Sequence, residues 1–303
     1  MQWVREERPD KARQRQYLHA LLVTLGGNVL LLTVKGVASY FSQSVALYAD
    51  AVNSLSDLIY ALLMVLGIWM SQRPPDLTHP QGHSRFEPLV GMVIALAMGG
   101  AGYSAAQAAW ARYQSGGLAV EPGLPTAVLL FSAAVKGGMY LLIRRMARAL
   151  DSPALMATAR DDLSDVLTSV TAVIGAAGSA YVHPLCDPVA AFLVTAAIFY
   201  AVFETFTENL RYLTGGGADE ETRAHIVAAA AAVPGVEGIH QVLTEYVGPR
   251  LAVDLHIEVD GELSLREAHA IANEVQRQVL ALPEVDRVYI HVEPAPPVAD
   301  GIG

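Results

Sequence analysis

Acidic and amide side chains recur at a four-residue spacing in two long apolar segments of the sequence. The first segment carries Asn53 and Asp57, and a later one carries Asp161 and Asp165. On a helix, residues four apart project from the same face, so each pair presents two oxygen ligands side by side. Carboxylates within a membrane are costly unless they are paired or solvated, and they usually mark a functional site. The two pairs therefore predict a four-ligand cation site between two membrane helices.

A structural interpretation of the same residues stands beside this one. The four side chains could form a hydrogen-bonded cluster, or line a water-filled cavity without binding an ion. That interpretation suits a single buried carboxylate better than two matched pairs. Asp50 lies one turn before Asn53, and Asp162 directly follows Asp161. Each could support the ligands, although for Asp162 the favoured interpretation is an ion pair with Arg160.

A third candidate group follows the second apolar segment. Asp76, His79 and His83 lie within eight residues of one another, in a stretch that also contains Pro and Gly. Carboxylate oxygens and imidazole nitrogens at this spacing can wrap one transition-metal ion. Solvated loop histidines are also common, so an unliganded loop is the alternative.

The last 89 residues carry another set of potential ligands. His291 and Glu293 alternate along one predicted strand, and His256 departs from the apolar stripe of another strand. Residues two apart on a strand share a face, so these side chains are predicted to gather on one side of a sheet. One or two metal sites are expected here, although each histidine alone would suit an ordinary surface position. The candidate ligands are His240, His256, His269, His291 and Glu293.

Composition places most of these residues in a membrane protein. The chain has 303 residues, of which 53% are hydrophobic and only 17% are charged, against about 25% charged in soluble domains. Residues 1–214 contain 15 Lys and Arg and 15 Asp and Glu, whereas residues 215–303 contain 5 and 15. The acidic tail would attract cations and repel nucleic acid. The single Cys186 excludes an internal disulfide and a Cys-rich zinc cluster.

Six apolar segments are long enough to cross a bilayer, which takes roughly 20 residues. We expect no cleavable signal peptide before them, because the first fifteen residues are polar. Lys and Arg gather at the N-terminus and in alternate connections, which predicts that both termini lie in the cytoplasm. The protein is expected in the cell membrane (plasma or inner membrane). Residues 1–214 are thus predicted to form a six-helix transmembrane domain, with spans at 17–40, 44–71, 87–113, 123–147, 154–181 and 187–210.

Residues 215–303 are predicted to form a soluble α+β domain. Alternating apolar residues indicate strands, and longer periodic segments indicate helices. The order is helix, strand, strand, helix, strand, which is typical of helices on one face of a small sheet. The predicted elements cover residues 219–232, 239–246, 251–259, 265–282 and 285–292.

Three segments together resemble the cation diffusion facilitator family of divalent-metal/proton antiporters. They are the run from Ser44 to Asp57, the loop from Gly82 to Leu89, and the closing strand from Val285 to Pro294. The resemblance implies a homodimer with a metallochaperone-like cytoplasmic domain, no enzymatic activity and no prosthetic group. It also assigns ligand roles to matching positions. The transport site would be Asn53, Asp57, Asp161 and Asp165; the loop site Asp76, His79 and His83; and the tail sites His240, His256, His269, His291 and Glu293.

The ligand types favour one ion over others. Zinc-type members of the family have a histidine in the intramembrane quartet, whereas this sequence has one amide and three carboxylates there. Oxygen-only ligands favour Mn²⁺, and imidazole suits Zn²⁺ better. The pattern also resembles the manganese-exporting branch, so Mn²⁺ is the predicted ion, with Zn²⁺ or Fe²⁺ as alternatives.

The predicted function is metal efflux by alternating access, with protons and metal competing for the carboxylates and the tail sensing metal. A membrane-anchored sensor without transport is one alternative, but a sensor needs no carboxylate pairs at membrane depth. A membrane metallohydrolase is another. The sequence contains no His-Glu-x-x-His motif and no Ser or Cys nucleophile signature.

Overall fold

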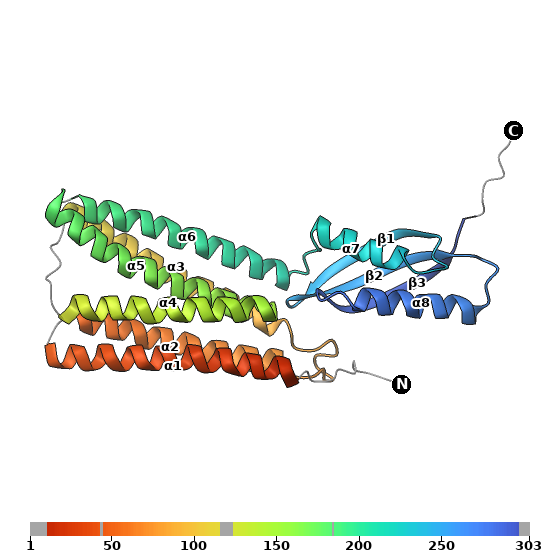
Figure 1. Ribbon diagram of the computed structural model, residues 1–303, viewed down its shortest axis with the longest axis horizontal. Coiled ribbons are helices and arrows are strands. Elements are labelled where there is room, and N and C mark those ends of the chain that lie inside the picture. The colour runs from red at the N-terminus through yellow and green to blue at the C-terminus, as the bar shows by residue number, and fades with distance from the viewer. Residues whose placement is uncertain (1–10, 43–44, 116–123, 184, 297–303) are drawn as a thin grey trace. The chain divides into compact units, whose positions relative to one another are not determined.

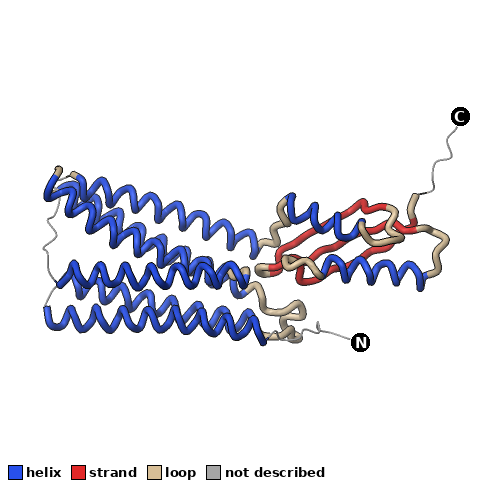
Figure 2. Tube along the Cα trace, viewed as in Figure 1, coloured by secondary structure: helices blue, strands red, loops and turns tan. Residues whose placement is uncertain are grey.

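The computed structural model describes residues 11–42, 45–115, 124–183 and 185–296, and it divides the chain into two units, Met1–Leu210 and Arg211–Gly303. Each unit is described by itself. The first consists of long helices lying side by side, and the second combines helices with strands (Figures 1 and 2). The long helices are α1 (Lys11–Ser42), α2 (Val45–Ser71), α3 (Phe86–Gln114), α4 (Leu124–Leu150), α5 (Pro153–Tyr181) and α6 (Cys186–Leu213).

Each predicted span corresponds to one of these helices, with ends that agree to within a few residues except at the polar start of α1. Five of the described helices are long and apolar enough to cross a membrane: α1, α2, α3, α4 and α6. α5 has 29 residues, which is long enough, but it contains Arg160 and three carboxylates. The helical membrane architecture is thus confirmed, and α5, the long helix outside these five, carries half of the predicted cation site.

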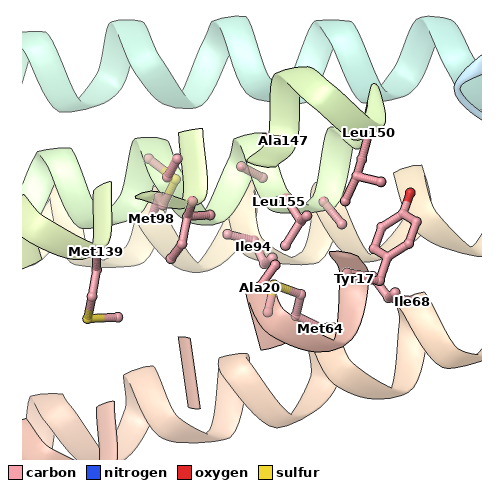
Figure 3. Packing of buried hydrophobic residues seen from close by; sticks show 14 residues of the cluster. Tyr17, Ala20, Met64, Ile68, Ile94, Met98, Met139, Ala147, Leu150 and Leu155 are labelled. Atoms are coloured by element: carbon pink, nitrogen blue, oxygen red, sulfur yellow. The ribbon is translucent and has the colours of Figure 1, made fainter. Parts of the chain in front are cut away.

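The core of the helical unit joins five helices. It includes Met64 and Ile68 of α2, Ile94 of α3, Ile143 of α4 and Leu155 of α5, with Tyr17 and Ala20 of α1 beside them (Figure 3). The start of α5 contributes the small residues Ala154, Ala157 and Ala159. Small residues let helix backbones approach closely in membranes. α5, which carries the acidic residues, is therefore tightly held against its neighbours.

A polar contact fixes the first turn of α5. Ser152 is its N-cap, accepts a hydrogen bond from the Leu155 N–H at 3.2 Å, and is followed by Pro153 in the first turn, where proline is well tolerated. The Ser152 hydroxyl also donates to buried Glu87 at the start of α3. Glu87 in turn accepts from the Tyr17 hydroxyl of α1 at 3.2 Å. Three helices are thus joined at one end of the unit.

The second unit has the predicted αββαβ order, which confirms the α+β fold. It contains α7 (Glu220–Ala231), β1 (Gly238–Val247), β2 (Arg250–Val259), α8 (Leu265–Leu280) and β3 (Val285–Pro294). β2 is central, antiparallel to β1 and parallel to β3. The parallel pair requires a crossover, and α8 provides it.

The two faces of this sheet differ. Alternate residues of β2, from Leu251 to Val259, are buried and pack with Ile226 of α7 and Val275 of α8. Both helices therefore cover the same face. The other face of β2 carries His256 and is only partly buried, as its departure from the apolar stripe predicts.

Candidate metal centre

Three carboxylates from two helices meet inside the helical unit. One oxygen each of Asp57 on α2, Asp161 on α5 and Asp165 on α5 lie within 4.8 Å of one another. Asp57 falls within the candidate span Ser54–Ser71. The side chain of Asn53, the fourth predicted ligand, lies outside the described residues, as does that of Asp50. The described part of this group therefore offers three oxygen ligands at a spacing that one cation can bridge.

A buried lysine on α4 contacts two of these three carboxylates. Lys136 Nζ lies 2.8 Å from Asp165 Oδ2 and 3.3 Å from Asp57 Oδ2. It also lies 3.0 Å from Asp162 Oδ1, and the lysine side chain is only 5% exposed. Two of the three described ligands thus share one ammonium donor with Asp162, a carboxylate that is almost fully buried.

The predicted ion pair between Arg160 and Asp162 is not formed, so that prediction is wrong. Arg160 instead binds Glu208 of α6 at 2.7 Å and Glu204 of α6 at 2.9 Å. Residues two positions apart on a helix point in nearly opposite directions, about 200° apart, so the Arg160 guanidinium faces α6 while Asp162 faces α4. Asp162 pairs with Lys136, and its second oxygen, Oδ2, is buried without a hydrogen-bond partner among the described residues.

Reasoning from the sequence missed Lys136, although a signal for it was present. Lys136 is a charged residue within the apolar span Thr126–Leu150, and such residues usually pair inside a bundle. Its partners are 26 or more residues away along the chain, so no local spacing pointed to them. Only the tertiary packing of the helices brings this ammonium, from α4, to carboxylates on α2 and α5.

The predicted loop residues also come together. Asp76, His79 and His83 each offer one ligand atom within 4.8 Å of the others, and the two imidazole rings have centroids 4.4 Å apart. Asp76 Oδ2 is 3.5 Å from His83 Nε2. His83 is buried, and its Nδ1 has no hydrogen-bond partner among the described residues. The loop thus brings two imidazole rings and one carboxylate together in a compact group of potential ligands.

Local hydrogen bonds hold the loop carboxylate in its ionised form. The Thr78 hydroxyl donates to Asp76 Oδ1 at 2.6 Å, and the His79 N–H donates to the same oxygen at 2.7 Å. These bonds favour the charged form and lower the pKa of Asp76 to about 2. The carboxylate is therefore available to a cation across the physiological pH range.

A third group lies on the open face of the small sheet. His240, His256 and Glu293 have ligand atoms within 4.8 Å of one another. His256 Nδ1 is 3.2 Å from Glu293 Oε1, and His240 Nε2 is 3.7 Å from Glu293 Oε2. His240 occupies a bulge between paired residues Ile239 and Gln241 of β1. Such bulges often redirect a side chain beside a functional site.

Two further predicted tail ligands have different positions. His291 is the direct register partner of His256, and its Nε2 is 3.3 Å from Glu293 Oε1, so it borders the group. His269 is exposed on α8 and belongs to none of the three described groups of potential ligands. Sequence reasoning also missed Glu258, whose Oε1 is 3.3 Å from His240 Nδ1.

Two family models match the chain, one for each unit. A model described as the cation efflux transmembrane domain matches residues 21–214, and one described as the cytoplasmic domain of cation efflux proteins matches residues 218–295.

Several relatives match along most of their length. A transporter of Methanocaldococcus jannaschii is 32% identical over 279 residues, which are 92% of this chain and 99% of that protein. The manganese efflux system protein MneS of Bacillus subtilis is 28% identical and covers 95% of this chain and 98% of its own. The magnetosome protein MamM of Paramagnetospirillum magneticum is 29% identical, over 89% of this chain and 86% of its own.

Proposed function

The chain belongs to the cation efflux family of divalent metal transporters, and we propose that it exports Mn²⁺ from the cytoplasm in exchange for protons. The family is one of transporters and not of enzymes. One observation carries the proposal. Carboxylates of α2 and α5 lie within 4.8 Å of one another inside a unit in which five of the described helices suit a membrane. A cation crossing the bilayer needs such oxygen ligands in place of its water.

The choice of ion rests on the ligand set. The described members of the intramembrane group are all carboxylates, and oxygen ligands suit Mn²⁺. Asn53 on α2 would add an amide oxygen, since it precedes Asp57 by four residues. A relative that covers nearly the whole chain is named as a manganese efflux protein, which agrees with this choice.

Exchange for protons follows from the charge of the site. The Lys136 ammonium contacts three carboxylates, and Asp161 lies beside two of them. This group has a formal charge of −3 when all four carboxylates are ionised. Such a charge within a bilayer requires cations or protons. Metal binding requires deprotonated ligands, so a site open to the cytoplasm would take up metal. Once open to the other side, it would take up protons and release metal.

The remaining parts of the proposal concern the tail and the assembly. Both termini would lie in the cytoplasm, so the groups of the loop and the tail would meet metal before export. We assign the tail group, with His291 at its border, a sensing role within a homodimer. A sensor must bind metal more tightly in one conformation than in the other.

The test is ion flux into proteoliposomes with an internal pH probe, comparing Mn²⁺, Zn²⁺, Fe²⁺ and Cd²⁺. We expect Mn²⁺ uptake with proton counter-movement in the wild type. Asp57→Ala and Asp165→Ala should each reduce the flux at least about a hundredfold, because each removes one of the few side chains that can bind the ion in this site. Thr168→Val, one turn beyond Asp165 on α5, is the matched control and should keep the flux.

Three outcomes would change the proposal. Undiminished flux in either Asp variant would show that the carboxylate group is not the transport site. Zn²⁺ flux in preference to Mn²⁺ in the wild type would retain the transporter and remove the argument from ligand type. No flux of any metal, together with metal binding by the tail, would favour a membrane-anchored sensor.

A further inference from the structure

The position of Lys136 bears on how the transport site releases its cation. Its ammonium contacts Asp57 and Asp165, two of the three described candidate ligands, at 3.3 Å and 2.8 Å. It reaches them from α4, a helix that contributes no ligand to the group. Lys136 is buried, so water cannot replace these contacts readily.

A divalent cation and this ammonium require the same oxygens. A first-row divalent cation binds carboxylate oxygen at about 2.1 Å. A cation at that distance from Asp57 and Asp165 would lie next to an ammonium that donates to both. The two positive charges would repel each other strongly at such short range. The Lys136 contacts observed here must therefore break before a cation can bind these two carboxylates.

Asp162 offers the ammonium another position. Its Oδ1 is already 3.0 Å from Lys136 Nζ, and its Oδ2 is buried without a hydrogen-bond partner among the described residues. Asp162 is outside the described ligand group. An ammonium has three donors, and the flexible lysine side chain can redirect them. Lys136 can thus leave Asp57 and Asp165 while staying paired to Asp162.

We propose that the Lys136 ammonium competes with the transported cation for Asp57 and Asp165, and that Asp162 holds the ammonium while the cation is bound. The inference rests on the proposed function of the carboxylate group. When the cation leaves, Lys136 returns to the ligands and neutralises part of their charge. The lysine thereby weakens cation binding and speeds release, which makes it a positioning residue of the transport cycle.

The charge-balanced double variant Lys136→Met/Asp162→Asn tests this role. It removes one positive and one negative charge together, so the net charge around the site stays the same. The measured quantity is the Kd of purified full-length protein for Mn²⁺, taken as the binding component that Asp57→Ala abolishes. We expect Kd to fall roughly tenfold, the change that about 1.4 kcal/mol of lost competition produces. In flux assays, KM should fall and the maximal rate should fall with it.

A fixed ammonium with a purely structural role predicts a different result. With the net charge preserved, Kd would be unchanged, or would rise if the site were disordered, and either result would overturn the proposal. Lys136→Arg keeps a charged donor and should restore Kd and KM to near their wild-type values. If the double variant binds Mn²⁺ more tightly but Lys136→Arg does not keep Kd and KM near their wild-type values, competition by a cationic side chain would also be contradicted.

Lys35 provides a matched control. It is another buried lysine, on α1, a helix that contributes no residue to the described carboxylate group. Lys35→Met and the single variant Lys136→Met each remove one buried positive charge, and Lys136→Met should lower Kd much more. An equal decrease would point to general electrostatics and overturn the proposal.

The binding assay separates this proposal from the proposed function. Wild-type protein that binds Mn²⁺ through Asp57 but transports no metal would refute the export function, while the Kd comparison would still decide the role of Lys136. Absence of binding that depends on Asp57 would refute the competition directly.

Discussion

Charged residues within the helical unit differ in how completely they are neutralised. Arg160 pairs with Glu204 and Glu208 of α6 at 2.9 Å and 2.7 Å, which is a structural clamp between two helices. The group around Lys136 has more carboxylates than cations. Ion pairs in a low-dielectric interior are retained when they are closely matched. The larger excess of acid at α2 and α5, four carboxylates to one ammonium against two carboxylates to the Arg160 guanidinium, therefore distinguishes the cation site from the clamp.

The fourth predicted ligand gives a prediction about selectivity. Asn53→His would place an imidazole one helical turn before Asp57, in a group whose described members are carboxylates. Imidazole suits Zn²⁺, whereas oxygen ligands suit Mn²⁺. We expect the ratio of Zn²⁺ to Mn²⁺ flux to rise about tenfold, measured by competition between the two ions in proteoliposomes.

Asn53→Asp is the control for this substitution, since it keeps an oxygen ligand and should leave Mn²⁺ preferred over Zn²⁺. An unchanged ion preference in Asn53→His, with transport retained, would place Asn53 outside the ligand set. The three carboxylates would then have to account for selectivity alone.

Among the elements, α8 has the most complete local stabilisation. The Ser264 hydroxyl accepts from the Glu267 N–H, and Glu267 Oε2 accepts from the Ser264 N–H at 2.9 Å, which forms a capping box. The hydrogen bonds from Ser264 lower the pKa of Glu267. They favour the ionised carboxylate, so the stabilisation is complete above the ordinary pKa of Glu and is lost as pH falls through the lowered value.

Removal of this cap should loosen the start of α8. Ser264→Ala leaves helix N–H groups without an acceptor, at a cost of about 1 kcal/mol. Amide hydrogen exchange at the first turn of α8 should then be about fivefold faster at neutral pH. Ser264→Thr retains a hydroxyl and serves as the control. Equal exchange in Ser264→Ala and the wild type would mean that packing of Val275 and Val279, and not the cap, holds the helix.

Elements were more predictable than the contacts between them. The bounds of β2 and α8 agree with their predicted ranges to within two residues, because periodicity and capping residues are local signals. The grouping of Asp57 with Asp161 and Asp165 was predictable because matched i,i+4 pairs mark the facing sides of two helices. The pairing of Arg160 was mispredicted and that of Lys136 was missed. Those contacts depend on helix rotation and on long-range packing, which one sequence does not specify.

At the scale of the whole molecule, the net charge is confined to the C-terminal tail. Residues 1–214 are neutral, and residues 215–303 carry 5 basic and 15 acidic residues, so the net charge of −10 lies in the tail. Like charges on one compact domain repel one another and oppose its compact state. The group of His240, His256 and Glu293 lies on the face of the sheet opposite α7 and α8. Cation binding there would offset some of this repulsion.

Metal binding should therefore stabilise the tail measurably. A ligand at 100 times its Kd contributes about 2.7 kcal/mol to the stability of the state that binds it. In the full-length protein, Mn²⁺ should slow amide exchange in the central strands β2 and β3, by up to about a hundredfold where exchange requires unfolding of the domain.

Two histidine variants decide whether the group of His240, His256 and Glu293 is responsible for that protection. His256→Ala removes the ligand that lies 3.2 Å from Glu293 in the middle of the sheet, so the protection by Mn²⁺ should be lost. His269→Ala removes an exposed histidine of α8 outside the group, so the protection should remain. The two changes alter formal charge and imidazole content equally, so a difference between them reports position alone. Loss of protection in His269→Ala but not in His256→Ala would mean that the tail binds metal through α8, and that the group on the open face of the sheet is an ordinary set of surface ion pairs.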